Sequence, residues 1–277
     1  MLTRPIPSSG EPLPVIGIGT WENFDFASKA PERVALAQVL DVLFAGGGRL
    51  IDSSPMYGKA EALVGSLMAD RPLPSDGQPK PFLATKVWTS GKREGIAQME
   101  LSLKLLGTQT LDLMQVHNLV DWQAHFDTLK GWKSEGRVRY LGITHYTPSA
   151  HAELETVMRA APWDFVQLDY SLEDRAAEER LLPLAAEKGM AVIVNRPFGG
   201  GGLIRKLRGT PLPEWAGGAG CSTWAALLLK FILARPEVTC VIPGTGNPKH
   251  MHEILEAGTG SLPDPATLKH MRALAKS

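Results

Sequence analysis

The feature that most constrains this chain is a regular alternation of short apolar runs with longer stretches of helical spacing. Most of the short runs are continuously apolar, which is typical of strands covered on both faces. The eight strand-like runs begin at Val15, Arg49, Phe82, Leu111, Arg139, Asp164, Ala191 and Val238. Eight strand–helix units in roughly 250 residues predict an α/β fold, a (β/α)8 barrel of the TIM type.

The stretches between the runs place apolar residues three and four apart, as helices with one buried face do. We expect helices over 32–45, 60–69, 93–106, 121–134, 149–160, 176–188, 222–234, 248–257 and near 266–275. A doubly wound open sheet is the alternative fold, but no GxGxxG phosphate loop follows the first strand. We therefore expect one barrel domain over residues 1–277, with a short N-terminal segment, 1–14.

Two segments interrupt the alternation. Residues 71–81 read as a proline-rich surface loop before the third strand. Residues 198–220 form a longer loop after the seventh strand, with a run of four glycines and three cations, Arg205, Lys206 and Arg208. Connections of this length are more often functional than not, although a solvated basic loop is an equal reading for the cations.

Composition limits the classes of partner. Basic and acidic residues number 29 each, so neither nucleic acid nor an anionic membrane is an expected partner. No apolar window has the roughly 20 residues of a membrane span, and no signal-peptide pattern opens the chain. The two cysteines, Cys221 and Cys240, lie in apolar surroundings and are expected to be buried, reduced thiols. These features predict a cytoplasmic monomer or weak oligomer that acts on a small molecule.

Polar side chains stand where three successive strands are expected to end. The second strand ends at Asp52, with Tyr57 in the loop that follows, the third ends at Lys86 and the fourth at His117. Taken singly, these residues could be a turn-capping acid, a packed aromatic, a solvated strand end and a core imidazole. Because barrel active sites lie at the C-terminal ends of the strands, their shared position predicts a reactive site.

The four residue types form a coherent chemical set. The phenol of tyrosine has a pKa of about 10, which is too high for easy proton donation near neutral pH. A neighbouring lysine ammonium lowers that pKa, and a carboxylate keeps the lysine charged. A histidine can orient a carbonyl oxygen. The set suits protonation of an alkoxide that forms as hydride arrives at a carbonyl carbon.

An ordered series of motifs carries a resemblance to a known family. The motifs are GIGTW at 17–21, IDSSPMYG at 51–58, ATKVW at 84–88, LDLMQVHN at 111–118, RYLGITH at 139–145, FVQLDYS at 165–171 and VIPGTGNP at 241–248. Over nearly its whole length the chain resembles the aldo-keto reductases. The resemblance implies an oxidoreductase that reduces an aldehyde or ketone with NAD(P)H. It also implies a catalytic tetrad in which Tyr57 is the general acid, Lys86 adjusts its pKa, Asp52 holds Lys86, and His117 orients the carbonyl.

The resemblance further implies that a dinucleotide lies across the top of the barrel. Thr144, His145 and Gln167 match the positions that bind the nicotinamide amide, although a core glutamine is the alternative reading of Gln167. The other candidate cofactor residues are Gly19, Thr20, Asp52, Asn195, Arg196, Pro243, Gly244, Thr245, Gly246, Asn247 and His250.

The last of these residues open a helix. Asn247 suits an N-cap and Pro248 a first helical position, and a helix N-terminus attracts phosphate. An ordinary capped helix start is the alternative reading. NADPH is the favoured cofactor and NADH remains possible, because Gly244 and His250 occupy positions where NADP-selective relatives often carry lysine and arginine.

For the substrate, Trp21, Trp88 and Asn118 are candidate pocket residues, and the two indoles could instead be packing at the barrel top. The chain lacks a long C-terminal extension, which predicts an open pocket. No metal is expected, because His250 and His252 stand two apart in a helix and no zinc-site spacing occurs. Two other functions stay open: a dinucleotide-binding regulatory protein with little turnover, and a Schiff-base aldolase that uses Lys86.

Overall fold

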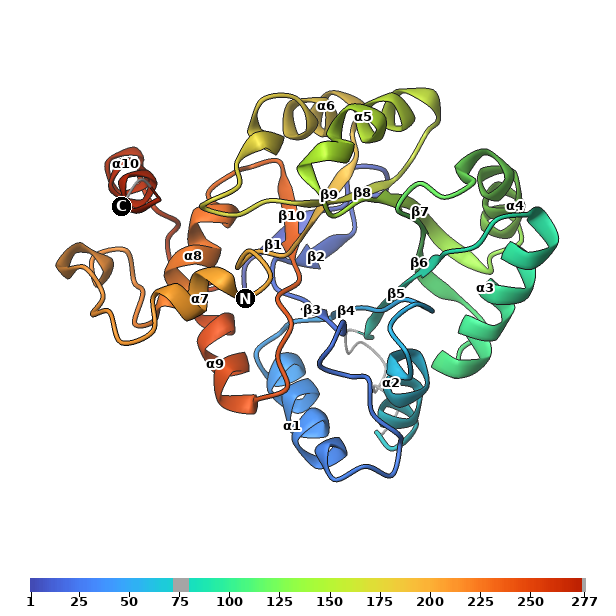
Figure 1. Ribbon diagram of the computed structural model, residues 1–277, viewed down its shortest axis with the longest axis horizontal. Coiled ribbons are helices and arrows are strands. Elements are labelled where there is room, and N and C mark those ends of the chain that lie inside the picture. The colour runs from blue at the N-terminus through green and yellow to red at the C-terminus, as the bar shows by residue number, and fades with distance from the viewer. Residues whose placement is uncertain (72–79, 276–277) are drawn as a thin grey trace.

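The computed structural model describes residues 1–71 and 80–275, and within them eight parallel strands form one sheet in sequence order (Figure 1). The strands are β3 (Ile18–Gly19), β4 (Leu50–Asp52), β5 (Phe82–Val87), β6 (Leu111–His117), β7 (Val138–Thr144), β8 (Phe165–Asp169), β9 (Ala191–Asn195) and β10 (Val238–Val241). All eight predicted strands are confirmed. Most of the loop expected at 71–81 lies outside the described residues.

The sheet closes into a barrel through the segment that precedes β3. Ile16 bridges Val241 in parallel. The amide of Gly17 donates to the carbonyl of Val241 at 2.9 Å, and the amide of Val241 donates to that of Val15 at 2.9 Å. On the other side, a side chain at Gly17 would meet the carbonyl oxygen of Leu50 at 2.8 Å, so glycine permits the close approach of this segment to β4. The predicted (β/α)8 barrel is confirmed.

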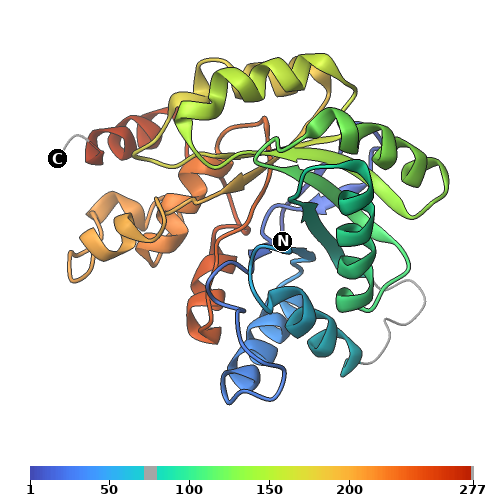
Figure 2. The same ribbon diagram turned by 45° about the vertical axis from the view of Figure 1, so that its right-hand side comes forward.

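Helices surround the strands in both views (Figures 1 and 2). They are α1 (Glu32–Ala45), α2 (Ala60–Ala69), α3 (Lys92–Leu106), α4 (Trp122–Ser134), α5 (His151–Ala160), α6 (Leu181–Lys188), α8 (Trp224–Leu233), α9 (Pro248–Glu256) and, at the edge of the molecule, α10 (Pro265–Leu274). No helix of the described residues is long and apolar enough to cross a membrane.

One predicted helix is divided. The pattern over 176–188 suggested a continuous helix, but the structure has a 3-10 turn, η2 (Ala176–Glu178), followed by α6 (Leu181–Lys188). Pro183 explains the break, because its ring clashes with the carbonyl four residues earlier in a continuous helix. A second 3-10 turn of three residues, η1 (Pro148–Ala150), likewise precedes α5.

Regular structure also occurs where loops were expected. The loop 198–220 contains a short helix, α7 (Gly202–Lys206), and a 3-10 turn, η3 (Glu214–Ala216). The N-terminal segment forms an antiparallel hairpin of β1 (Thr3–Pro5) and β2 (Pro12–Pro14). Both strands of this hairpin are only three residues long and contain proline, so strand periodicity could not reveal them.

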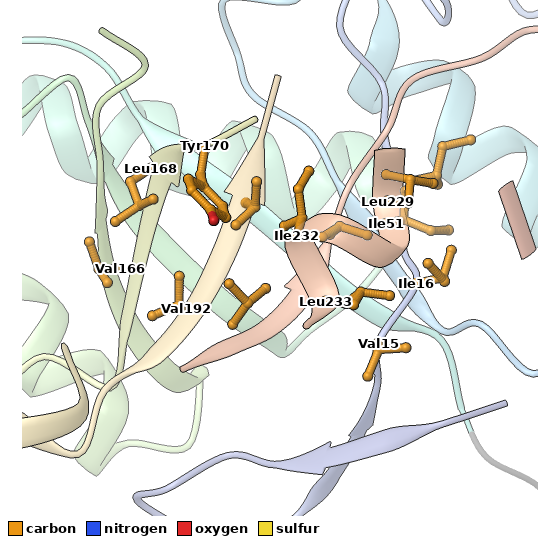
Figure 3. Close-up of a cluster of buried hydrophobic side chains, with 14 of the residues drawn as sticks. Val15, Ile16, Ile51, Val166, Leu168, Tyr170, Val192, Leu229, Ile232 and Leu233 are labelled. Atoms are coloured by element: carbon orange, nitrogen blue, oxygen red, sulfur yellow. The ribbon is translucent and has the colours of Figure 1, made fainter. Parts of the chain in front are cut away.

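Two apolar clusters result. The larger lies between the strands and the helices; Figure 3 shows part of it, including Val166 and Val192 of the sheet and Ile232 and Leu233 of α8. The smaller fills the barrel interior, where Ile6 and Leu13 of the hairpin join inward residues from the early parts of the strands. Both cysteines are free and buried, as predicted. The hairpin therefore plugs the N-terminal end of the barrel and leaves the opposite end for polar groups.

Candidate active site

A buried ion pair joins the ends of β4 and β5. The ammonium of Lys86 donates to Oδ2 of Asp52 at 2.5 Å and to the carbonyl of Ser53 at 2.7 Å. The two side chains are 0% and 2% exposed. Burial by itself lowers the pKa of Lys86, but the charge of Asp52 and the polar contacts outweigh it, so the pKa is raised above its ordinary value. Lys86 is therefore a cation at neutral pH.

The second oxygen of Asp52 is held by two amides. Nε2 of Gln115 and Nε2 of Gln167 each donate to Oδ1 at 2.9 Å. Gln115 lies in the middle of β6, in register with Lys86 of β5, and is fully buried. The sequence reading missed Gln115. A glutamine two residues before His117 in an otherwise apolar strand was the available signal, because alternate residues of a strand share a face.

Tyr57 lies above the ion pair. Its ring centroid is 5.0 Å from Nζ of Lys86 and 5.9 Å from the ring of His117, which it meets edge-on. Burial raises the pKa of the Tyr57 phenol, Lys86 acts to lower it, and Asp52 adds to the rise. Lys86 therefore acts on this pKa in the expected direction, although the pKa itself lies above its ordinary value. Burial outweighs the cation, so the phenol holds its proton.

His117 is a neutral imidazole. Burial, followed by the charges of Lys86 and His145, lowers its pKa to about 2. Its Nδ1 lies 2.9 Å from Oγ of Ser54, a second residue that the sequence reading passed over. Ser54 stands in the turn between Asp52 and Tyr57, so the motif that supplies the acid and the phenol also supplies a partner for the histidine.

A cavity of about 570 Å³ opens above these residues. Asp52, Tyr57 and His117 line it, whereas Lys86 lies beneath. Other predicted residues that line it are Gly19, Trp21, Asn118, Thr144, Gln167, Asn195, Arg196 and Gly244. Its lining also includes Arg205, one of the three cations of the loop 198–220, and residues that were not predicted, among them Glu22, Asn23, Met56, Tyr146 and Phe198. The structure thus brings most of the predicted residues around one cavity.

Some predicted residues stand outside this lining. Thr20 is buried, and its hydroxyl donates to the carbonyl of Asp52 at 3.1 Å. Nδ1 of His145 accepts from the amide of Tyr146 at 3.0 Å, and the two rings stack. Trp88 is 41% exposed, with its ring 6.4 Å from that of His117. Thr20 therefore stabilises the end of β4, and the side chain of His145 forms hydrogen bonds within its own turn.

The remaining predicted residues lie between β10 and the first turn of α9, namely Pro243, Thr245, Gly246, Asn247 and His250. Oδ1 of Asn247 accepts from the amide of Lys249 at 3.0 Å, so the predicted N-cap is confirmed. The hydroxyl oxygen of Thr245 accepts from the amide of Asn247 at 3.1 Å. His250 is exposed on the first turn of α9. These contacts order the segment and leave the helix start facing solvent.

Two amide oxygens of the cavity are ready for a ligand. Oδ1 of Asn118 and Oδ1 of Asn195 are buried without a hydrogen-bond partner among the described residues. The amide of Gln167, in contrast, is fully engaged, because its oxygen accepts from Thr144 and from Asn195 at 3.3 Å each. Buried acceptors without donors are costly, so a ligand with N–H groups such as a carboxamide would satisfy them.

The cavity wall also carries positive charge. Arg196 and Arg205 are exposed and form no ion pair with any other described residue. The guanidinium of Arg196 lies 5.5 Å from the ring centroid of Tyr146, and its backbone has a φ of 47°. A non-glycine residue in this conformation is uncommon and often marks a functional site. Among the described residues, no group of three His, Cys, Asp or Glu side chains could hold a metal ion.

Comparisons with known proteins agree with this geometry. The aldo/keto reductase family matches residues 15–266. Methylglyoxal reductase YeaE of Escherichia coli is 28% identical over 241 residues, which cover 83% of this chain and 80% of that protein. Aldo-keto reductase YhdN of Bacillus subtilis is 25% identical over 194 residues, or 65% of this chain and 56% of that protein.

A solved structure gives the same fold. An aldo-keto reductase from Klebsiella pneumoniae in complex with NADPH superimposes with a TM-score of 0.82, at 23% identity, over 99% of this chain and 96% of that one. At this level of identity the likeness establishes the barrel architecture.

Proposed function

Since the chain belongs to the aldo/keto reductase family, we propose that it reduces an aldehyde or ketone to an alcohol, with Tyr57 as the general acid. The observation that carries the proposal is the meeting of Tyr57, His117 and the buried Asp52–Lys86 pair at the floor of one cavity. A phenol, a neutral imidazole and a buried cation surround the place where the carbonyl oxygen would lie.

We propose NADPH as the favoured cofactor, with NADH possible. The Klebsiella pneumoniae relatives were solved with NADPH and with NADP. In this chain the unpartnered oxygen of Asn195 would accept from the nicotinamide carboxamide, with Gln167 and Thr144 behind it. The unpaired cations Arg196 and Arg205 and the start of α9 would meet the phosphates. When bound, the reduced dinucleotide supplies the hydride.

The residues of the chain supply the proton and stabilise the charges that form when it is transferred. Tyr57 carries its phenolic proton at neutral pH, since the ordinary pKa of a phenol is about 10 and burial raises that of Tyr57 further. As negative charge develops on the carbonyl oxygen, the proton passes from Tyr57 to that oxygen, and the Lys86 ammonium stabilises the phenolate left behind. Asp52 keeps Lys86 charged and in place, and His117 donates a hydrogen bond to the same oxygen.

The substrate is a small-molecule carbonyl compound. The relative from Escherichia coli is named a methylglyoxal reductase, which supports an aldehyde or ketone as the reacting group. Trp21, Trp88 and Asn118 would form the walls on the substrate side. Trp21 lines the cavity and is 49% exposed, and Trp88 is 41% exposed with its ring 6.4 Å from that of His117, so both indoles offer apolar surface to a substrate.

The aldolase alternative is disfavoured by the state of Lys86. A Schiff base requires a neutral amine, but the pKa of Lys86 is raised and its side chain is 0% exposed beneath the ion pair. No substrate carbonyl could reach Nζ without breaking its contacts with Asp52 and Ser53.

The test combines binding and turnover. Titration of the protein with NADPH and NADH, followed by its tryptophan fluorescence, reports cofactor binding. Addition of a panel of aldehydes and ketones, followed by absorbance of the reduced cofactor, reports turnover. We expect NADPH binding and oxidation with at least one aldehyde. Failure to bind either cofactor would refute the proposal, whereas tight binding without turnover on the whole panel would favour a regulatory protein.

A further inference from the structure

Ser54 is a buried hydroxyl that touches the proposed site without facing the cavity. It follows β4 in the turn that leads to Tyr57 and is 0% exposed. Its Oγ lies 2.9 Å from Nδ1 of His117, and it also accepts from the amide of Met56 at 3.3 Å. The resemblance to the reductases assigned no role to this side chain.

The direction of the bond to His117 follows from counting protons. A serine hydroxyl has one hydrogen to donate, and its oxygen can accept. Among the described residues, Nδ1 of His117 is the one acceptor within reach of the Ser54 hydroxyl, whereas the amide of Met56 is a donor. If Nδ1 carried a proton, the buried hydroxyl hydrogen would have no partner, which is an unfavourable arrangement. The hydroxyl of Ser54 therefore donates, and Nδ1 accepts.

The direction of this hydrogen bond determines whether the other ring nitrogen, Nε2, carries a proton. His117 is neutral at physiological pH, because burial lowers its pKa to about 2, so the ring carries a single proton. With Nδ1 as the acceptor, that proton is on Nε2. Nε2 forms no hydrogen bond with the described residues, and the ring lines the cavity. A hydrogen-bond donor is thus presented to the cavity from the same ring.

We propose that Ser54 is a positioning residue that fixes His117 in the tautomer with its proton on Nε2, which makes the imidazole a donor to the substrate carbonyl oxygen. The role in turnover rests on the proposed carbonyl reduction, but the tautomer can be measured without cofactor or substrate. Failure of the proposed function would therefore leave the tautomer result intact, and the reverse also holds.

The direct test is a long-range ¹H–¹⁵N NMR spectrum of the uniformly ¹⁵N-labelled protein between pH 6 and 8. The chain has seven histidines, so a His117→Gln variant identifies the signals of His117 by their loss. We expect a protonated Nε2 and an unprotonated, hydrogen-bonded Nδ1. A protonated Nδ1 in the unmodified protein would overturn the proposal.

The variant Ser54→Ala tests whether Ser54 is the cause. We expect the ¹⁵N shifts of His117 to move toward a mixture of tautomers. With one neutral hydrogen bond lost, kcat/KM should fall about threefold to tenfold while the Kd for NADPH stays the same. Ser54→Cys, which retains a weak donor, should lie between the two. Unchanged shifts in folded Ser54→Ala protein would show that something else sets the tautomer.

A neighbouring serine provides the matched control. Ser53 is also buried, and its hydroxyl oxygen accepts from the hydroxyl of Thr20 at 3.0 Å, away from His117. Ser53→Ala should leave the His117 signals in place. Equal shifts in Ser53→Ala and Ser54→Ala would mean that general loosening of the turn, and not the Ser54 hydroxyl, moves the histidine, and would contradict the proposal.

Discussion

The two ends of this barrel are built from the same strands but have opposite character. At the N-terminal end, Ile6 and Leu13 of the hairpin complete an apolar interior. Glu11 ties the hairpin to the strands, because its carboxylate pairs with Arg139 and Arg49 and accepts from the hydroxyl of Tyr140. At the C-terminal end, the interior becomes a polar layer that opens into a cavity of about 570 Å³.

A single strand shows how close the two environments are. Along β5, Phe82 and Ala84 belong to the apolar interior cluster, and Lys86, two residues further on, carries the buried charge. The same change occurs along β6 between Leu113 and Gln115. Two residues advance a strand by roughly 7 Å, so the inward side chains change from apolar to charged or polar over that distance. This division predicts that substitutions at the two ends have separable effects.

The largest expected effect is on turnover at the open end. Tyr57→Phe removes the proton donor but keeps the ring that meets His117. We expect kcat for carbonyl reduction to fall about 10²- to 10⁴-fold, the range typical of general acid catalysis. Steady-state kinetics with NADPH and an aldehyde measure it. The free energy of unfolding, from urea denaturation, should change by less than about 1 kcal/mol, and retention of kcat would remove Tyr57 from the mechanism.

The next largest effect is expected from a substitution that changes stability and turnover together. Lys86→Met leaves the Asp52 carboxylate buried beside Gln115 and Gln167 without a counter-charge. Removing one member of a buried ion pair costs about 3–5 kcal/mol. We therefore expect both a large loss of stability in urea denaturation and a loss of turnover.

The double variant Asp52→Asn, Lys86→Met tests whether the unpaired carboxylate causes the loss of stability. With both charges gone, much of the lost stability should return, since no uncompensated charge remains buried. Turnover should stay low, because nothing stabilises the phenolate of Tyr57. A double variant as unstable as Lys86→Met would show that lost packing, and not the unpaired carboxylate, causes the instability.

At the closed end the expected effect is on stability alone. Ile6→Ala removes a fully buried side chain from the hairpin plug and should lower the free energy of unfolding by about 2–5 kcal/mol. Well below its melting temperature, the folded variant should keep the kcat and NADPH affinity of the unmodified protein. A large fall in kcat of the folded variant would mean that the plug also shapes the site.

The smallest expected effect is a pH dependence of stability that originates at the open end. His117 binds a proton only near pH 2 when folded but near 6.5 when unfolded. Below pH 6.5 the unfolded chain therefore holds one more proton, and stability falls as pH falls, by up to about 1.4 kcal/mol per pH unit. Urea denaturation of the unmodified protein and of His117→Asn between pH 6.5 and 5.0 measures this difference. Parallel pH profiles for the two proteins would contradict it.

Much of the barrel could be predicted because its strands and helices carry strong periodic patterns. Apolar runs such as 111–117 and helical spacing such as 32–45 report burial directly, and the structure confirms both. The hairpin at 1–14 could not be predicted in this way, because short proline-containing strands have no periodicity. Pro183 marks the break before α6, but the helical spacing of apolar residues continues across it, so that spacing alone predicts one helix.

The site was predictable to the extent that its residues end strands. Asp52, Lys86 and His117 were located by that rule, and the structure brings them together. Gln115 and Ser54 were missed because their roles depend on which oxygen or nitrogen they face, and spacing along the chain does not contain that information. The raised pKa of Tyr57 was missed for a similar reason, since the degree of burial in a loop follows from tertiary packing.

The protein is expected to catalyse hydride transfer from NADPH to a carbonyl carbon within the cavity above Tyr57. The most direct test uses NADPH deuterated at the transferable position of the nicotinamide, with an aldehyde that the protein turns over. Mass spectrometry of the product should find one deuterium on the former carbonyl carbon, at a rate that Tyr57→Phe lowers at least about 10²-fold. Alcohol formed without deuterium, or at an equal rate by Tyr57→Phe, would contradict the mechanism.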